Sequence, residues 1–425
     1  MDCKTHWIRR LLNKANCSTM LIQTVDDLRA DLPITQKCAY LQTGSYSPVP
    51  ASTQRYMAEM LIEENEVALT AGSKAEYSDF YQRADVARQT LAGLLGVSAD
   101  EVAYSTNTTT ATRLAVRSLD WRAGDKLALS DVEHASTFDM ARGMQKQVGV
   151  TTTIFPSGEG PTFSPDYFLD QLARGLTRDH RLLILCQVAN TDGRRLPVQE
   201  AVQIARSRGV KTLIDGAQAV GVFPVDVAAI DADFYTGSLH KWLMGPAGVG
   251  FLVVNHRQWA EYNPNWQPPD AKDGLVNAAT RSELGTPNYV LRLGAAHSIE
   301  NLKRIGLTGI ETHLRELTAY LRRGVRVIPG VANCGPDGWE LSSSITTLQF
   351  DGADADACKR LVAQLRERFS IVTKFRPEVC GVRVAVAAFN TIDEIDRLLQ
   401  ALKVLVPTIC SRRLFARLDQ PSSGL

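Results

Sequence analysis

Short apolar runs alternate with helix-like patterns through the first two thirds of this chain, and this alternation constrains the fold more than any other feature. The strand-like runs are Glu101–Ser105, Lys126–Ser130, Thr151–Phe155, Leu182–Val188, Lys211–Ile214, Phe234–Tyr235 and Gly248–Val254. Helical patterns such as Val198–Arg208 lie between them. Strands separated by helices usually pair in parallel, with the helices covering the sheet. We therefore predict an α/β fold with a mostly parallel seven-stranded sheet.

The pattern changes after about residue 290. A long helical pattern covers Leu291–Arg326, and the runs after it are Ser343–Phe350 and Val382–Ala388 as strands and Asp356–Phe369 and Asp393–Leu405 as helices. These elements indicate a smaller α+β domain. A chain of 425 residues exceeds the usual size of one compact core. We predict an N-terminal arm over residues 1–39, a large domain over 40–290, a small C-terminal domain over 291–410 and a tail over 411–425.

The charge balance favours a small-molecule partner. Lys and Arg together number 47 and Asp and Glu number 46, so no overall field exists to attract nucleic acid or an anionic membrane. We therefore expect neither of these partners. The chain also lacks a run of roughly 18 apolar residues, the length that a membrane helix needs.

The cysteines and the first residues of the chain point to the cytoplasm. The eight cysteines are scattered without a C-x-x-C pair: Cys3, Cys17, Cys38, Cys186, Cys334, Cys358, Cys380 and Cys410. This spacing suits reduced thiols better than disulfides, and it indicates no metal site. The first twenty residues carry four cations but no apolar stretch of signal-peptide length. They are expected to form a loose amphipathic arm or to precede an alternative start at Met20.

Lys241 and Asp215 are the strongest candidates for catalytic chemistry. Asp215 follows the apolar run Lys211–Ile214, so it is expected at the carboxyl end of a strand, where open α/β sheets bind their ligands. Lys241 lies between another strand and a glycine-rich segment, a setting that partly desolvates an amine and lowers its pKa. Pyridoxal phosphate needs a lysine for its aldehyde and an acid opposite its pyridine nitrogen. These two residues predict a site for that cofactor.

Hydroxyl and amide side chains complete the predicted cofactor site. The run Ser105-Thr-Asn-Thr-Thr-Thr110 ends a strand and opens a helix, and free backbone N–H groups at such a helix start bind phosphate. An ordinary helix cap would have the same pattern. Ser238 and His240 flank the lysine and are expected to contact the phosphate. Gln218, one turn after Asp215, is expected to reach the phenolic oxygen.

These motifs, in this order, resemble the class V aminotransferase family, a branch of the fold type I pyridoxal phosphate enzymes that includes cysteine desulfurases, selenocysteine lyases and cystine C–S lyases. The resemblance covers about Tyr40 to Leu405. It implies that the cofactor is bound by Asn107, Thr108, Thr109, His134, Asn190, Asp215, Gln218, Ser238, His240, Lys241 and Thr286. It also implies that His134 stacks on the cofactor ring and that Lys241 and His134 are the catalytic residues.

The same resemblance implies a substrate clamp and a shared site. Arg383, in Gly381-Val-Arg-Val-Ala, matches the arginine that binds the substrate α-carboxylate, a task that suits a planar guanidinium. The turn containing Thr286 matches a loop that reaches the phosphate of the neighbouring subunit, which implies a homodimer. Ser45 and Tyr46 are further candidates for the substrate pocket. Tyr289 and Trp266 are other candidate pocket walls.

The reaction is expected to be β-elimination at a C–S bond of an amino acid. A desulfurase needs a mobile thiol, and Cys380 lies only three positions before Arg383, too close to swing over the substrate. This short segment, with Lys374 nine positions before Arg383, is similar to the cystine C–S lyase type. Lys374 either binds a second carboxylate or is solvated. Desulfuration, transamination and epimerisation remain alternatives, and a non-catalytic regulator with this fold is the contrasting hypothesis.

Overall fold

The computed structural model describes residues 22–70, 78–266 and 277–418. A seven-stranded sheet forms its larger part, in the order β2-β8-β7-β6-β5-β3-β4. The strands are β2 (Val102–Ser105), β3 (Lys126–Ser130), β4 (Thr151–Phe155), β5 (His180–Cys186), β6 (Lys211–Asp215), β7 (Phe234–Ser238) and β8 (Gly250–Val254). Strand β8 runs antiparallel to both neighbours, and the pairs from β7 to β4 are parallel. The prediction of a mostly parallel seven-stranded sheet is confirmed.

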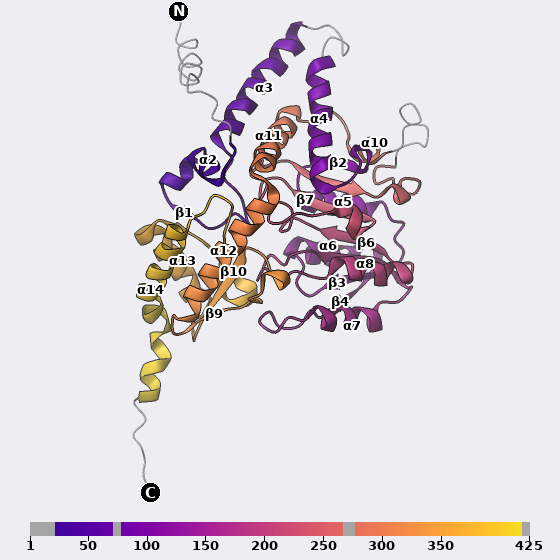
Figure 1. Cartoon of the computed structure of the whole chain (residues 1–425). Coiled ribbons are helices and arrows are strands. Elements are labelled where there is room, and N and C mark those ends of the chain that lie inside the picture. The colour runs from indigo at the N-terminus through magenta and orange to yellow at the C-terminus, as the bar shows by residue number, and fades with distance from the viewer. Residues whose placement is uncertain (1–21, 71–77, 267–276, 419–425) are drawn as a thin grey trace, which may run out of the picture.

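Both faces of this sheet are covered by helices (Figure 1). The first face packs Leu182, Ile184 and Leu213 against the helices α5 (Thr108–Arg117) and α6 (Ala135–Val148). The other face packs the alternate residues Leu183 and Leu185 against α7 (Pro165–Gly175) and α8 (Val198–Ser207). Successive side chains of a strand point to opposite faces, so strands buried on both sides need continuous apolar runs. This requirement explains the sequence Leu182-Leu-Ile-Leu185.

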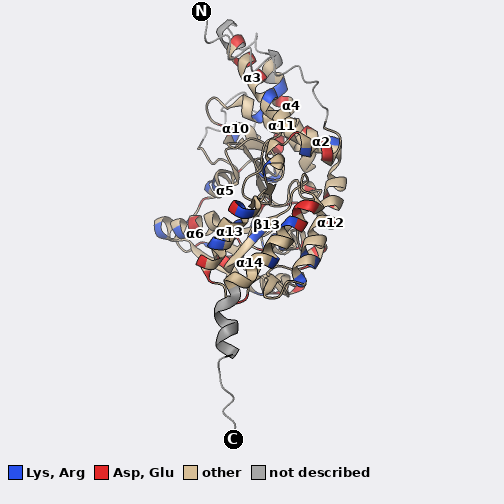
Figure 2. Cartoon of the chain, turned by 90° about the vertical axis from the view of Figure 1, so that its left-hand side faces the viewer, with Lys and Arg blue, Asp and Glu red and all other residues tan. Residues whose placement is uncertain are grey.

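A second sheet, antiparallel and in the order β12-β13-β10-β9, forms the C-terminal part. Its strands are β9 (Val331–Asn333), β10 (Ile345–Phe350), β12 (Lys374–Arg376) and β13 (Gly381–Ala385). The helices with it are α12 (Leu307–Arg326), α13 (Ala355–Phe369) and α14 (Ile392–Leu418). In Figure 2, which faces this part of the molecule, basic and acidic residues are interspersed over the ribbons. The predicted domain limits at residues 39, 290 and 410 stay a prediction.

The long helix expected over Leu291–Arg326 is two helices, and this prediction was wrong. Helix α11 (Tyr289–Ile305) ends at Gly306, and α12 begins at Leu307. Gly306 has a φ of 91°, which a residue with a side chain rarely adopts, so the glycine permits the break. The apolar periodicity continues across the break, which is why the sequence suggested one helix.

The N-terminal segment pairs with strands of the C-terminal part. Strand β1 (Ala39–Tyr40) pairs in parallel with β11 (Ile371–Val372), and Gln42 bridges to Ala385 of β13. Before it lie α2 (Val25–Ala30) and a 3₁₀ turn at Pro33–Gln36. Arg29 of α2 donates to Glu394 of α14 at 3.0 Å. Residues 39–42 are therefore held beside the C-terminal sheet, whereas the Ser47 N–H donates to the His240 carbonyl at 2.8 Å, next to Lys241.

The remaining elements are a helical arm and short turns. Helices α3 (Ala51–Thr70) and α4 (Ser78–Leu95) project together beside α11 (Figure 1). The short elements are α9 (Val227–Ile230), α10 (Ala278–Ser282) and 3₁₀ turns at Ala99–Glu101, His256–Gln258, Trp339–Leu341 and Pro377–Val379. None of the helices in the described ranges is long and apolar enough to cross a membrane. Most of the predicted N-terminal arm and the last seven residues of the tail lie outside the described residues.

Candidate active site

Lys241 lies in the bend that follows β7, three positions after Ser238. Burial, with smaller effects of the cations Arg383, Arg376 and Lys374, lowers the pKa of its amine from 10.5 to about 8, although Asp215 acts in the opposite direction. An amine with this pKa is partly neutral near physiological pH, and only the neutral form is a nucleophile or a base. The bend therefore presents a reactive lysine.

Asp215 ends β6, at the carboxyl edge of the parallel strands where the sequence predicted it. One of its carboxylate oxygens accepts a hydrogen bond from the Ala217 backbone N–H at 2.9 Å. The pKa values of Lys241 and His134 are lowered overall, and the Asp215 carboxylate opposes both shifts. The three groups therefore occupy one electrostatic environment. Asp215 can hold a positive charge beside the lysine.

A second carboxyl group, Glu133, lies in the same environment and was missed from the sequence. It is fully buried, and it accepts hydrogen bonds from the Ser130 hydroxyl at 2.5 Å and the Cys186 backbone N–H at 2.9 Å. Burial, with Asp215 adding to it, raises its pKa to about 8. Glu133 is therefore neutral at pH 7. Its only sequence signal is an acidic residue directly before His134 at the end of a strand.

The predicted phosphate-binding turn contacts the end of β7. Asn107 caps α5, its side-chain oxygen accepting from the Thr110 N–H at 3.0 Å. The Thr108 N–H donates to the Ser238 hydroxyl at 2.9 Å, and the two hydroxyls lie 2.6 Å apart. The hydroxyl of Thr109 points instead to Ser136, at 3.2 Å. Four of the predicted phosphate ligands thus meet at one helix N-terminus.

The two histidines have different surroundings. The Nδ1 atom of His240 is buried with no hydrogen-bond partner among the described residues, and burial lowers its pKa to about 4. The ring of Tyr46 lies 5.6 Å from the His240 ring. His134 caps α6, and its Nδ1 accepts from the Ser136 N–H at 3.2 Å, so the neutral ring carries its hydrogen on Nε2. Burial and Lys241 lower the pKa of His134.

Gln218 and Asn190 are held by neighbours from distant segments. The Gln218 side chain donates to the Gly44 carbonyl at 2.9 Å and accepts from the Trp242 indole at 2.9 Å, which leaves one amide hydrogen for a ligand. The side-chain oxygen of Asn190 accepts from Arg376. Because its oxygen is occupied in this way, Asn190 presents its NH₂ group as a donor.

Arg383 points from β13 toward the N-terminal loop. Its side chain is 1% exposed, and it donates to the Ser45 hydroxyl at 2.6 Å and to the Asn190 carbonyl at 2.8 Å. A Cβ at Gly44 would lie 3.4 Å from the guanidinium, so a glycine there lets the loop pass closely over the arginine. Burial lowers the pKa of Arg383 to about 9. Ser45 therefore lies beside Arg383 and Tyr46 beside His240, and their role in the substrate pocket stays a prediction.

Strand β12 carries two further cations, which lie next to Arg383 of β13. Lys374 is the register partner of Arg383, and Arg376 lies on the same face two residues later. Arg376 contacts Asn190, and it also donates to Glu378 at 2.8 Å. The sequence suggested Lys374 as a second cation but missed Arg376, which no local pattern distinguishes from a surface arginine.

Cys380 points away from these cations. Its φ of 47° follows the 3₁₀ turn at Pro377–Val379, and its thiol lies 3.8 Å from the Ala353 carbonyl, just before α13. The thiol packs against the apolar core. Burial raises the pKa of the thiols of Cys38, Cys186 and Cys334. A raised pKa disfavours the thiolate, which is the nucleophilic form, so these three cysteines are poor nucleophiles.

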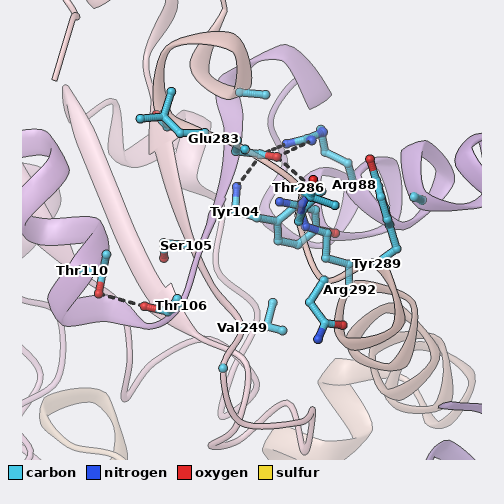
Figure 3. A pocket seen from close by; sticks show the side chains of 18 of the residues that line it. Arg88, Tyr104, Ser105, Thr106, Thr110, Val249, Glu283, Thr286, Tyr289 and Arg292 are labelled. Carbon is cyan, nitrogen blue, oxygen red and sulfur yellow. Dashed lines mark hydrogen bonds and ion pairs between the residues drawn. The ribbon is translucent and has the colours of Figure 1, made fainter. Parts of the chain in front are cut away.

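Thr286 lies in a pocket of about 610 Å³ that borders the phosphate-binding turn (Figure 3). Thr106, Thr110 and Tyr289 line the same pocket. Glu283 organises one wall, because its carboxylate accepts from Arg88 at 2.5 Å, from Arg292 at 2.7 Å and from the Tyr104 N–H at 2.8 Å. Trp266 instead stacks on Arg117 at the far end of α5, which is about 15 Å long.

This set of groups fits pyridoxal phosphate. A lysine of lowered pKa suits an aldehyde, and a carboxylate at the strand end suits a protonated pyridine nitrogen. The helix N-terminus with its hydroxyls suits a phosphate, and the buried, unpartnered Nδ1 of His240 lies one residue from the lysine.

Three comparisons with known proteins agree. The family model for aminotransferase class-V matches residues 39–398. The isopenicillin N epimerase of Streptomyces clavuligerus is 31% identical over 91% of this chain and 99% of its own, and a cysteine desulfurase of Cronobacter sakazakii is 27% identical over 89% and 97%. The structure of the cystine C–S lyase C-DES with its product cysteine persulfide superposes with a TM-score of 0.78 at 23% identity, over 88% of this chain and all of that one.

The family match covers all seven strands of the large sheet, the bend with Lys241 and strand β13. The structural likeness, at 23% identity, supports the fold. The chain therefore belongs to the class-V aminotransferase family and is a pyridoxal phosphate-dependent enzyme.

Proposed function

We propose that Lys241 carries the cofactor and serves as the base. In this proposal Asp215 holds the pyridine nitrogen, and Asn190 and Gln218 face the phenolic oxygen. The phosphate ligands are Asn107, Thr108, Thr109, Ser238 and His240, with Thr286 supplied by a neighbouring subunit. The ring of His134 stacks on the cofactor. The contact between Thr108 and Ser238 and the unpartnered nitrogen of His240 support this arrangement.

We propose that Arg383 binds the α-carboxylate of an amino-acid substrate. Its guanidinium is buried and is held by two neutral acceptors, so it keeps its charge for a ligand. Ser45 and Tyr46 line the same side of the pocket. With the carboxylate fixed, the α-hydrogen faces Lys241, whose lowered pKa lets it accept a proton.

The proposed reaction is β-elimination at a C–S bond. When bound, pyridoxal phosphate supplies a protonated ring that stabilises negative charge at the substrate α-carbon. Lys241 takes the α-proton, the Cβ–S bond breaks with its electron pair on sulfur, and a thiol or persulfide leaves. Water then converts the remaining carbon skeleton to a keto acid and ammonia. Asp215 balances the positive charge throughout.

The orientation of Cys380 favours elimination over desulfuration. Desulfuration needs a protein thiol to attack the substrate sulfur, whereas the Cys380 thiol packs toward Ala353 and the core. Elimination needs no such thiol. The C–S lyase of similar fold is described as releasing cysteine persulfide, which is the product class proposed here.

Epimerisation is the second candidate, because the relative at 31% identity is an isopenicillin N epimerase. It would share the first step, removal of the α-proton by Lys241, and would end with the return of a proton to the opposite face of the carbon. The cysteine desulfurase relative keeps desulfuration as a third candidate.

One experiment separates these candidates. The cofactor-loaded enzyme is incubated with cystine and, separately, with cysteine, and pyruvate and alanine are quantified together. Pyruvate without alanine supports elimination, and alanine with released sulfur would replace it by desulfuration. If the amino acid is retained but loses its optical purity, the reaction is epimerisation instead of elimination. The Lys241→Ala variant is the control and should form none of these products.

We also propose a homodimer with shared sites. Apolar side chains are exposed on α3, α4 and the turn before Thr286, namely Leu61, Ile62, Val86 and Leu284. Light scattering should give twice the chain mass. Mixed dimers of Lys241→Ala and Thr286→Asp subunits should regain activity, because one of their two sites has both native residues. No recovery after subunit exchange would contradict shared sites.

We further propose that the enzyme resides in the cytoplasm. The described cysteines Cys38, Cys186, Cys334, Cys358 and Cys380 are free thiols. Unpaired thiols are typical of a reducing compartment. Cell fractionation with an antibody to the chain tests this location.

A further inference from the structure

Three charged side chains form a cluster at the start of the loop that carries Thr286. The Glu283 carboxylate accepts from Arg88 of α4 at 2.5 Å and from Arg292 of α11 at 2.7 Å. It also accepts from the Tyr104 N–H of β2 at 2.8 Å. The side chains of Arg88, Glu283 and Arg292 are only 16%, 15% and 12% exposed. One carboxylate therefore joins the loop to two helices and to the edge strand of the large sheet (Figure 3).

Several contacts fix the geometry of this cluster. Burial raises the pKa of Glu283, but Arg88 and Arg292 act against it and bring the pKa below its usual value. Both guanidiniums also lie over the Tyr104 ring, 5.1 and 4.5 Å from its centre, at the distance of a cation–π contact. Arg88 further donates to the Val102 carbonyl at 2.8 Å. Charged groups held from several sides in this way keep one arrangement.

The loop beyond the cluster projects from the surface. Residues 284–286 are exposed, and the apolar Leu284 among them is 62% exposed. At the other end of the loop Asn288 caps α11, its side chain accepting from a backbone N–H three residues later at 3.0 Å. One turn further on, Arg292 returns to Glu283. Both ends of the loop are therefore fixed, and the segment between them is presented to a partner.

The pocket beside the loop contains both halves of a reciprocal contact. Its lining includes Thr286 and also Thr106 and Thr110 of the phosphate-binding turn. In a two-fold symmetric dimer each copy presents the same surface, so a surface that gives a loop must also receive one. One subunit can then extend its Thr286 to the turn of the other while its own turn receives the loop of that partner.

We propose that Arg88, Glu283 and Arg292 position Thr286 for the cofactor phosphate in the neighbouring subunit. They are positioning residues that act across the dimer interface, so that the cluster of one chain sets the cofactor affinity of the other. The proposal rests on the proposed homodimer with shared sites, and it adds the residues that hold the exchanged loop. Because the loop is fixed before binding, less conformational entropy is lost when its hydroxyl meets the phosphate.

The first test compares ligands with and without the phosphate. Glu283→Gln removes the central charge of the cluster and keeps an oxygen for the Tyr104 N–H. Fluorescence titration of the apoenzyme should show pyridoxal phosphate bound about tenfold more weakly, at the lower end of what a charge-assisted hydrogen bond contributes. Pyridoxal has the same aldehyde and ring, and without the phosphate contact its affinity should change by no more than about twofold. Equal losses for both ligands would overturn the proposal.

Asp85→Asn is the matched control for this comparison. Asp85 is an exposed carboxylate that lines the same pocket, so its removal changes the charge of the pocket and leaves the contacts of Glu283 in place. Both affinities should stay unchanged in this variant. A loss in Asp85→Asn as large as that in Glu283→Gln would assign the effect to the charge of the pocket and would overturn the positioning role.

Heterodimers of differently tagged chains decide in which subunit the cluster acts. Borohydride fixes the cofactor on Lys241, and mass spectrometry of the intact chains then gives the occupancy at each cofactor concentration. When a Glu283→Gln chain is paired with a Lys241→Ala chain, the native lysine receives an intact loop and should bind as in the wild type. When a wild-type chain is paired with a chain carrying both substitutions, the native lysine receives the altered loop and should bind about tenfold more weakly.

The opposite pattern, or equal weakening in both heterodimers, would overturn the action across the interface. Thr286→Val tests the proposed function separately. If this variant keeps its affinity for pyridoxal phosphate, or if light scattering gives the mass of one chain, the shared site itself fails. If Thr286→Val weakens binding and Glu283→Gln does not, only the positioning role fails. Arg88→Gln, which leaves Glu283 paired with Arg292, replaces Glu283→Gln in every comparison if circular dichroism shows that the latter does not fold.

Discussion

Lys374 and Arg383 are cross-strand partners on β12 and β13, so two cations stand side by side on one face of a small sheet. Like charges in this position destabilise a strand pair by up to about 1 kcal/mol. We expect Lys374→Gln to stabilise the ligand-free protein by about 0.5 kcal/mol for that reason. Urea unfolding at low salt measures the difference. Salt should reduce it, and a destabilised variant would contradict the proposed repulsion.

Capture of the cofactor by the apoenzyme should depend on pH with a midpoint near 8. The pKa of Lys241 is lowered from 10.5 to about 8, and only the neutral amine attacks an aldehyde. The capture rate should therefore be constant above the midpoint and fall tenfold per pH unit below it. Stopped-flow absorbance after mixing apoenzyme with pyridoxal phosphate measures the rate. A midpoint near 10.5 would show that the amine is solvated.

Substitution of Arg383 should act mainly on substrate binding. Arg383→Gln removes a buried cation and should lower kcat/KM by about 100-fold through KM, since charge-assisted pairs contribute about 2 to 3 kcal/mol. Arg383→Lys keeps the charge without the planar fork, and we expect it to recover only part of the loss. Steady-state kinetics with the amino acid that proves to be turned over measures both. Unchanged KM would remove the clamp role.

Cys380→Ser should leave product formation unchanged. The thiol lies toward Ala353 and the core, so a hydroxyl in its place keeps the local contacts. The substitution removes the nucleophilic sulfur that sulfur transfer needs. Pyruvate and alanine from cystine and cysteine are the measured products. A loss of alanine and sulfide in the variant, with the fold intact by circular dichroism, would instead identify Cys380 as a sulfur acceptor.

Glu133→Gln should make stability less dependent on pH. The pKa of Glu133 is about 8 in the folded chain and about 4.5 when unfolded, so the folded form binds the extra proton between these values. Below pH 4.5 the carboxyl group is neutral in both states and does not oppose folding. As the pH rises from 4.5 to about 8, the unfolded chain loses this proton first, so the free energy of unfolding falls. The amide keeps both hydrogen bonds to Ser130 and Cys186. Urea unfolding of the apoenzyme at several pH values measures the slope, and exposed Glu200→Gln is the control.

The strands of the large sheet were the most predictable part of the fold. Lys126–Ser130 begins and ends where the apolar run does, because burial on both faces leaves little freedom in sequence. The edge strand Thr151–Phe155 also has its predicted limits, although much of it is exposed. The break at Gly306 could not be predicted from periodicity, since one glycine within an amphipathic pattern is compatible with a continuous helix.

The site was predictable where ordered motifs mark it and unpredictable where distant segments meet. Asp215 and Lys241 follow their strands as expected. Arg376 was missed because its partner Asn190 is 186 positions away and β12 has only three residues. Glu133 was missed because nothing in its neighbours predicts that a carboxyl group at a strand end will be closed off from water.

The contact between Ser45 and Arg383 spans 338 positions, and β1 pairs with β11 over a similar separation. Nascent chains fold from the N-terminus as they emerge. The segments that carry Asp215 and Lys241 are therefore synthesised well before the one that carries Arg383. The residues that we propose to bind the cofactor are therefore synthesised before the arginine that we propose to bind the substrate. Assembly of the proposed substrate site has to wait for the C-terminal strands, even though one of its residues, Ser45, is synthesised early.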